Sequence, residues 1–232
     1  LPTSTAQNME PAPATSLCNH KMTKAAMNWI REHRHNPDNT IVGCSDGSVF
    51  DHRVEGGYAW SLYERTPDGD LREIGVWGTG KERVMGLDVT AIHSYRTEAT
   101  AVLAALSTLD RHGWQGKVEW HMDCTGVINT YNKLPHMRYS NWYAQRDKDV
   151  WERIHRIRPR WRKRLQLNHV KAHVDKDKHR VLSPEERGNT LMDFMAKAAC
   201  KDKDLKSVTG LDGAQVWGVY MHGYRVTGHT KE

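Results

Sequence analysis

The chain has 232 residues, a formal net charge of +6 and a hydrophobic content of 38%, enough for the core of one ordinary domain with additional segments. It contains no run of eighteen apolar residues, and residues 1–19 have neither a charged start nor an apolar stretch, so we expect neither a membrane span nor a secretory signal. The four cysteines are far apart in the sequence and include no Cys-x-x-Cys pair. We therefore expect free thiols in a reducing, intracellular compartment, which the sequence does not narrow to cytoplasm or nucleus.

The first 37 residues divide into two segments. Residues 1–19 are rich in Pro, Thr, Ser and Ala and poor in aromatics, which predicts a disordered leader. Residues 20–37 predict a short amphipathic helix, because apolar side chains recur at helical spacing at Met22, Ala25, Ala26, Trp29 and Ile30. We expect this helix to dock on the domain that follows; the alternative is a contact with a partner.

Residues 38–202 are predicted to form the main domain. Strands over 41–48, 57–64 and 71–78, with a tight turn at Thr66-Pro-Asp-Gly69, indicate an antiparallel meander. Helices over 95–112, 125–133, 147–158 and 188–200 alternate with strands over 117–121 and 165–171. This order predicts an α/β domain with a five-stranded mixed sheet, antiparallel in its first three strands, and helices on both faces.

Four acidic residues lie at the ends of these elements. Asp46 ends the first strand, Asp123 ends the fourth, Glu98 lies in the first turn of the first long helix, and Asp193 in the first turns of the last helix. Clustered carboxylates repel one another and persist where cations compensate them, and oxygen-only ligation favours Mg²⁺ or Mn²⁺ over zinc. We expect the four acids to converge on a metal site. The alternative for each acid is a surface or helix-capping carboxylate.

Six short motifs, taken together, resemble the ribonuclease H family from Ile41 to about Cys200. They are Ser45-Asp-Gly-Ser48, Gly56-Gly-Tyr-Ala59, Tyr95-Arg-Thr-Glu-Ala99, His121-Met-Asp-Cys124, His169-Val-Lys-Ala-His173 and Gly188-Asn-x-x-x-Asp193. The form Ser94-Tyr-Arg-Thr-Glu-Ala99 is similar to ribonuclease H domains of reverse-transcribing mobile elements. The resemblance therefore implies a ribonuclease H-like fold, and an adjoining reverse transcriptase domain as a partner.

The resemblance also implies an activity, endonucleolytic hydrolysis of the RNA strand of RNA/DNA hybrids by two divalent ions, Mg²⁺ with Mn²⁺ as a substitute. Asp46 would bridge both ions, Asp193 would help hold the ion that activates water, and Glu98 and Asp123 would hold the ion at the leaving 3′ oxygen. The products would carry a 5′ phosphate and a 3′ hydroxyl. His173 matches a loop histidine of the family and would assist turnover. We expect a monomer.

Two sets of residues are expected to contact the substrate. The resemblance implies contacts with the RNA backbone at Gly47, Ser48, Ser94, Tyr95, Arg96, Thr125 and Asn189. The sequence departs from the family pattern at Cys124, His93 and Thr125. The basic run 158–164 predicts phosphate contacts through Arg160, Arg162 and Arg164, with Trp161 stacking on a sugar or base. The alternative for this run is a solvated helix end.

Residues 203–232 are predicted to be a C-terminal extension in which 216–226 form two short strands, a possible hairpin. Two alternatives to the hydrolase remain open. One is a catalytically silent ribonuclease H-like scaffold that binds nucleic acid, although such domains typically lose one or more of the acids. The other is a different nuclease of the same fold, such as an integrase-like or junction-resolving enzyme, which the motifs ending at His173 and Asp193 fit less well.

Overall fold

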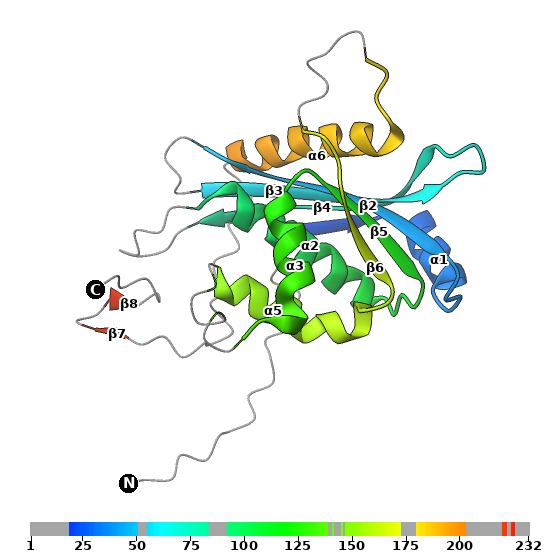
Figure 1. The fold of residues 1–232 in the computed structure, drawn as a ribbon. Helices are drawn as coiled ribbons and strands as arrows, with labels where there is room; N and C mark the ends of the chain where they lie inside the picture. The colour runs from blue at the N-terminus through cyan, green and yellow to red at the C-terminus, as the bar shows by residue number, and fades with distance from the viewer. Residues whose placement is uncertain are drawn as a thin grey trace.

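The computed structural model describes residues 19–50, 55–83, 92–138, 141, 145, 147–172, 180–202, 220–221 and 224–225. A mixed six-stranded sheet with the order β1-β4-β3-β2-β5-β6 forms its centre (Figure 1). The strands are β1 (Asn19–Met22), β2 (Thr40–Val49), β3 (Glu55–Arg65), β4 (Leu71–Arg83), β5 (Lys117–Met122) and β6 (Leu165–His169).

Five of these strands form the predicted sheet. Strands β2, β3 and β4 are antiparallel neighbours, and β5 and β6 continue the sheet parallel to β2. The predicted turn between β3 and β4 is present, with Gly69 at a φ of +87°, a conformation that favours glycine. The α/β fold and the antiparallel arrangement of the first three strands are therefore confirmed.

Strand β1 is an addition that the sequence did not predict. It pairs antiparallel with β4, from Asn19 opposite Thr79 to Met22 opposite Val76, so Met22 ends a strand instead of starting a helix. Thr23 then caps helix α1 (Lys24–His33) by accepting a hydrogen bond from the Ala26 backbone N–H at 3.1 Å. Helix α1 packs on the domain, as expected, because Ala26 and Ile30 are buried in the main core. Residues 1–18 lie outside the described residues.

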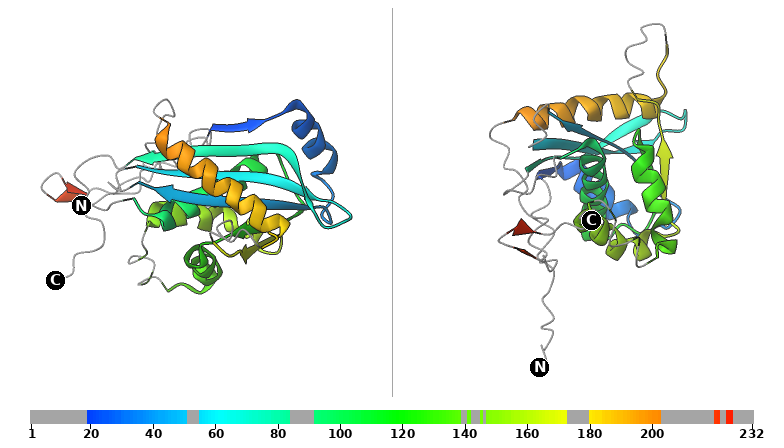
Figure 2. Two further views of the ribbon diagram at one scale, coloured as in Figure 1. Left: turned by 90° about the horizontal axis from the view of Figure 1, so that it is seen from above. Right: turned by 60° about the vertical axis from the view of Figure 1, so that its left-hand side comes forward.

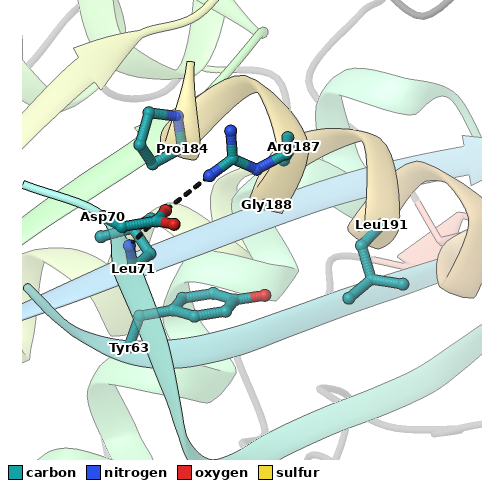
Figure 3. Close-up of a pocket in the computed structure, with 7 residues that line it drawn as sticks. All are labelled: Tyr63, Asp70, Leu71, Pro184, Arg187, Gly188 and Leu191. Carbon is teal, nitrogen blue, oxygen red and sulfur yellow. Dashed lines mark hydrogen bonds and ion pairs between the residues drawn. The ribbon is translucent and has the colours of Figure 1, made fainter. Parts of the chain in front are cut away.

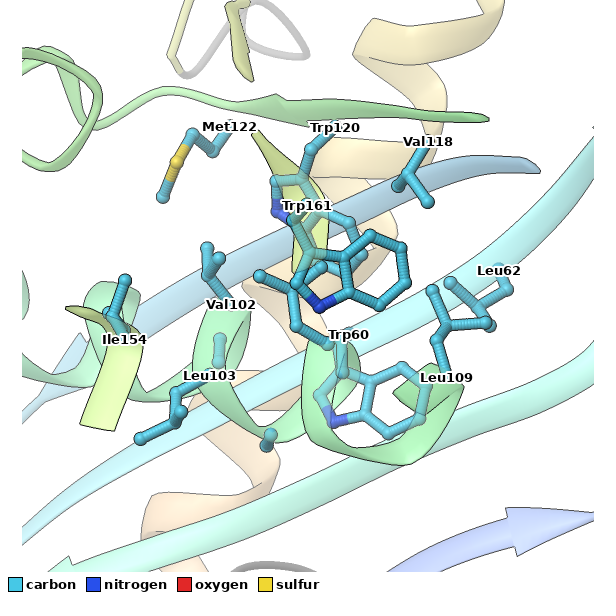
Figure 4. Packing of buried hydrophobic residues seen from close by; sticks show 14 of the residues in the cluster. Trp60, Leu62, Val102, Leu103, Leu109, Val118, Trp120, Met122, Ile154 and Trp161 are labelled. Atoms are coloured by element: carbon cyan, nitrogen blue, oxygen red, sulfur yellow. The ribbon is translucent and has the colours of Figure 1, made fainter. Parts of the chain in front are cut away.

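Helices cover both faces of the sheet (Figures 1 and 2). One face carries α1, α2 (Ser94–Arg111), α3 (Thr125–Lys133) with the 3₁₀ turn η2 (Leu134–His136), and α5 (Lys148–Trp161). The main core lies there, around fully buried side chains that include Trp60, Trp120 and Trp161 (Figure 4). A smaller core between the sheet and α6 (Pro184–Lys201) contains Cys44 and Met192. Burial of each large apolar side chain contributes about 1.5–3 kcal/mol.

Helix α6 begins four residues earlier than predicted, at Pro184. A capping box starts it: the Glu186 N–H donates to Ser183 Oγ at 3.2 Å, and the Ser183 N–H donates to Glu186 Oε2 at 2.9 Å. The Ser183-Pro-Glu-Glu186 spacing carried this signal in the sequence. As a consequence, Asp193 lies near the middle of α6 rather than in its first turns, so it does not act as a helix-capping carboxylate.

The C-terminal extension contains two short strands, β7 (Tyr220–Met221) and β8 (Tyr224–Arg225), which pair antiparallel. The remaining residues of 203–232 lie outside the described residues. No helix in the described part of the chain is long and apolar enough to span a membrane.

Candidate metal centre

Strand register brings Asp46 and Asp123 to the same level of the sheet. Strands β2 and β5 pair in parallel up to Cys44 opposite His121, so two further residues on each strand reach Asp46 and Asp123. Strand β5 ends at Met122, whereas β2 continues to Val49. The two carboxylates therefore meet where β5 stops and the sheet opens beside β2.

Gly47 allows helix α2 to bring Glu98 to this point. A Cβ placed on Gly47 would lie 2.6 Å from the backbone nitrogen of Glu98 and closer still to Oγ1 of Thr97. Any side chain at this position would push the start of α2 away from β2. Glycine beside Asp46 is therefore a packing requirement of the site, and it explains how an acid on a helix joins two acids on strands.

The carboxylates of Asp46, Glu98 and Asp123 form a tight cluster, called here the acid trio, with one oxygen from each residue within 4.8 Å of the others. Asp46 is 5% exposed and Glu98 is 2% exposed. Burial raises the pKa of Asp46 to about 7, and the negative charge of Asp123 acts in the same direction. Burial also raises the pKa of Glu98 well above its ordinary value, and its hydrogen bond with Asp46 adds to this rise.

The acid trio has the properties of an incomplete cation site. The Gly47 N–H donates a hydrogen bond to Asp46 Oδ1 at 2.8 Å. Oε2 of Glu98 is buried and has no hydrogen-bond partner among the described residues. A divalent cation with oxygen ligands would neutralise the carboxylates and use this oxygen, so the donor set fits Mg²⁺ or Mn²⁺.

Asp193 approaches Asp46 from α6, which covers the opposite face of the sheet from α2. Cys44, two residues before Asp46 on β2, lies against Gly188 of the same helix. Asp193 is outside the acid trio, but its hydrogen bond to Asp46 contributes to the raised pKa of Asp46. Its other carboxylate contact is with Lys197, whose Nζ donates to Asp193 Oδ2 at 2.5 Å. Lys197 was not among the predicted site residues, although its i,i+4 spacing from Asp193 is a signal of this contact in the sequence.

The residues predicted to contact the substrate differ in how exposed they are to solvent. Ser94 and Thr125 are exposed at the first positions of α2 and α3. The backbone carbonyl of Ser48 accepts a hydrogen bond from the Cys200 thiol. Asn189 is 5% exposed, and its Oδ1 has no hydrogen-bond partner among the described residues. His173 lies outside the described residues.

Tyr95 and Arg96 are held by protein contacts. The Tyr95 hydroxyl donates to Thr130 Oγ1 at 2.8 Å. The Arg96 guanidinium pairs with Asp149, Asp147 and Glu82, and its side chain is only 20% exposed. This arrangement leaves little of the guanidinium for a contact with RNA. These acidic partners were not predicted, because they come from two other elements, β4 and the start of α5.

The basic run 158–164 makes contacts within the protein that were not predicted for it. Trp161 is fully buried, so the prediction that it stacks on a sugar or base is wrong. Arg160 pairs with Asp110, and Arg164 lies 4.6 Å above the Trp161 ring and donates to the Trp114 carbonyl. Arg162 is exposed.

The position of the run also separates it from the acids. The backbone of Arg164 accepts a hydrogen bond from Val118, near the start of β5, whereas Asp123 follows the end of that strand. The five residues from Val118 to Asp123 span about 17 Å at about 3.3 Å per residue. The contacts of Arg160, Trp161 and Arg164 show a helix end packed on the domain, which differs from the solvated helix end stated as the alternative for this run.

The three cysteines in the described part of the chain, Cys44, Cys124 and Cys200, are free, as predicted; Cys18 lies outside it. A small pocket of about 140 Å³ lies between the β3–β4 hairpin and the start of α6 (Figure 3). The Arg187–Asp70 ion pair crosses its edge, and Tyr63, Leu71 and Leu191 are among its lining residues. None of the four acids lines this pocket, so it is separate from the metal centre.

Comparisons with known proteins agree with this geometry. A family model described as RNase H matches residues 38–201. The structure is similar to the protease-reverse transcriptase of Prototype Foamy Virus (TM-score 0.55, 17% identity), covering 70% of this chain and 21% of the viral protein. It is also similar to LC9-RNase H1, described as a type 1 RNase H with the type 2 active-site motif (TM-score 0.51, 13% identity, 72% and 74% of the two chains). The chain thus spans about a fifth of the viral protein's length. No curated protein matches the sequence.

Proposed function

This chain belongs to the RNase H family, and from that premise we propose that it cuts the RNA strand of RNA/DNA hybrids in a reaction that requires divalent metal ions. The observation that carries the proposal is the acid trio, in which Asp46, Glu98 and Asp123 offer oxygens within 4.8 Å of one another. Family membership supplies the substrate class, and the trio supplies the chemistry.

Four side chains of this protein would hold the metal ions. Asp46 belongs to the acid trio with Glu98 and Asp123 and also interacts with Asp193, which suits a ligand shared by two ions. Bound Mg²⁺ or Mn²⁺ supplies positive charge at the attacking and leaving oxygens of a phosphodiester. The carboxylates would hold the ions in their ionised form. The expected products have a 5′ phosphate and a 3′ hydroxyl.

The remaining family positions would orient the RNA strand. Gly47, Ser48, Ser94, Tyr95, Thr125 and Asn189 are proposed contacts to its backbone, and discrimination against DNA would come from 2′-hydroxyl groups. His173, by its motif, would move a proton or help the cleaved phosphate leave. The protein would act as a monomer in a reducing compartment.

The setting of the activity is proposed from the Ser94-Tyr-Arg-Thr-Glu-Ala99 form and from the similarity to a viral protease-reverse transcriptase. On this basis, the domain would work beside a reverse transcriptase in a retroelement protein. The second candidate function, a silent nucleic-acid-binding scaffold, is disfavoured by the acid trio, because a domain without catalysis has no need for three clustered acids, two of which have pKa values raised by burial.

A cleavage assay with strand-specific labels tests the proposal. RNA/DNA hybrid, duplex DNA and duplex RNA are incubated with Mg²⁺, Mn²⁺ or a chelator. The expected result is that only the RNA of the hybrid is cut, and only with a divalent ion. Full activity in chelator, or cleavage of duplex DNA at a comparable rate, would refute it. Binding of the hybrid without any cleavage would favour the scaffold.

A further inference from the structure

Arg96 sits at the centre of a charged cluster that joins three elements beside the metal centre. Its guanidinium donates two parallel hydrogen bonds to Asp149, at 2.8 and 2.7 Å, and a third to Asp147 at 3.3 Å. Its Nε lies 3.5 Å from Oε2 of Glu82. Because Arg96 belongs to α2, Glu82 to β4 and the two aspartates to the start of α5, one side chain ties all three together. These residues are called the arginine cluster below.

The arginine cluster depends on the guanidinium for its charge balance. Three carboxylates, from Glu82, Asp147 and Asp149, face one arginine, and Nε2 of His93 lies 3.3 Å from Asp147 Oδ2. Glu82 is 4% exposed, and it also accepts a hydrogen bond from Thr100 at 2.9 Å. Without the arginine, buried like charges would face one another, which pushes elements apart.

The backbone at the start of α5 places Asp147 and Asp149 so that both can bind Arg96. Asp147, the residue before the helix, has a φ of 54°, in the left-handed region that non-glycine residues rarely adopt. Asp149 lies in the first turn, where a carboxylate is favoured by the helix dipole. The planar fork of arginine matches the two oxygens of Asp149, which lysine cannot do.

Arg96 and Glu98 lie on different sides of the same helical turn. Residues two apart on an α-helix are separated by about 200° around the axis. Glu98 therefore points to β2 and the acid trio, while Arg96 points to α5 and β4. On the trio side, Gly47 lets the helix backbone rest directly on the strand. The first turns of α2 are thus held from both sides, by contact with β2 and by the arginine cluster.

We propose that Arg96 is a positioning residue for the metal centre: through Asp149, Asp147 and Glu82 it fixes the first turns of α2, and so holds Glu98 in the acid trio. The proposal rests on the proposed function of the trio as a metal site. Arg96 acts through the helix and contacts neither the metal ions nor the RNA. It replaces the role as an RNA contact that the sequence suggested for this residue.

The test compares Arg96→Gln with Arg160→Gln. Arg160 provides a matched control, because its pair with Asp110 also joins α5 to α2, but at the far end of the helix. Mn²⁺ binding is measured by titration calorimetry without nucleic acid, together with the melting temperature. Arg96→Gln should weaken Mn²⁺ binding about 10–100-fold, the usual effect of losing a partner behind a metal ligand. Arg160→Gln should leave Mn²⁺ affinity unchanged.

Three results would overturn the proposal: unchanged Mn²⁺ affinity in Arg96→Gln, an equal loss in Arg160→Gln, or a rise in KM for the hybrid with unchanged kcat. The last would identify Arg96 as an RNA contact. If Arg96→Gln does not fold, Arg96→Lys keeps the charge but not the fork, and it should fold with weakened Mn²⁺ binding; parent-like binding would contradict the proposal. The titration contains no nucleic acid, so it gives its answer even if the parent protein fails to cut hybrids.

Discussion

Asp46→Asn should stabilise the metal-free protein at alkaline pH while removing its response to metal. Burial and neighbouring acids raise the pKa of Asp46 from 3.8 to about 7. A group with a raised folded pKa stabilises the fold fully below its unfolded pKa, and that stability is lost as pH rises through the folded pKa. The parent therefore loses stability between pH 4 and 8, and asparagine, which does not ionise, avoids this loss.

The size of the effect follows from the pKa. A rise from 3.8 to about 7 corresponds to a loss of at most about 4 kcal/mol by pH 8, at about 1.36 kcal/mol per pH unit. Asparagine keeps an oxygen for the Gly47 N–H, so the net gain should be about 1–4 kcal/mol. For a domain of this size, each kcal/mol raises Tm by about 2–4 °C.

Thermal melting in chelator and in Mg²⁺, at pH 5 and pH 8, measures this effect. In chelator, Asp46→Asn should melt above the parent at pH 8 and close to it at pH 5. Mg²⁺ should raise the Tm of the parent and leave that of the variant unchanged. Asp70→Asn serves as control, since Asp70 is half exposed and pairs with Arg187 away from the site. If the variant melts below the parent in chelator at pH 8, the ionised carboxylate of Asp46 does not destabilise the folded protein, and the reasoning is refuted.

Three further predictions concern single features of the chain. Gly47→Ala should lower the free energy of unfolding by about 1–3 kcal/mol and weaken Mn²⁺ binding, since its Cβ would meet the backbone of Glu98; urea unfolding and calorimetry measure both, and an unchanged protein would contradict the packing argument. His173→Ala should lower kcat several-fold to about 100-fold with hybrid affinity intact, and equal turnover across pH 6–9 would make the histidine a bystander. Deletion of residues 1–23, which removes β1 and the Thr23 cap, should lower Tm, whereas deletion of 1–18 should not; equal effects would contradict a structural role for β1.

Much of the site was predictable because its residues follow regular elements. The strand patterns predicted Asp46 and Asp123 at the ends of their strands; in the structure β2 runs three residues past Asp46, to Val49, and parallel pairing of β2 with β5 still places the two acids together. The role of Gly47 in admitting α2 was not visible, since close approach of two backbones depends on tertiary packing. The acidic partners of Arg96 were hidden for the same reason: they lie 14, 51 and 53 residues away in the sequence.

The errors have identifiable physical causes. The predicted helix ended at Arg158, but α5 continues through Pro159 to Trp161, which places the tryptophan on the same buried side as Val150 and Ile154. Trp161, the only aromatic residue of the basic run, is therefore part of the core and does not stack on nucleic acid. The four residues of β1 show no alternation of polar and apolar side chains, so the sequence did not indicate a strand there. The strand forms because the edge of β4 offers backbone hydrogen-bonding groups to pair with.

The most direct test of the account is cleavage of an RNA/DNA hybrid by the parent and by Asp123→Asn in the same Mg²⁺ buffer, with the 5′ end of the RNA labelled. We expect RNA fragments with 3′ hydroxyl ends from the parent, and loss of cleavage in the variant with hybrid binding retained. Asp123 belongs to the acid trio, so removing its charge removes a ligand without emptying the core. Equal cleavage by both proteins, or fragments that end in a 3′ phosphate, would contradict a metal-dependent hydrolysis at these carboxylates.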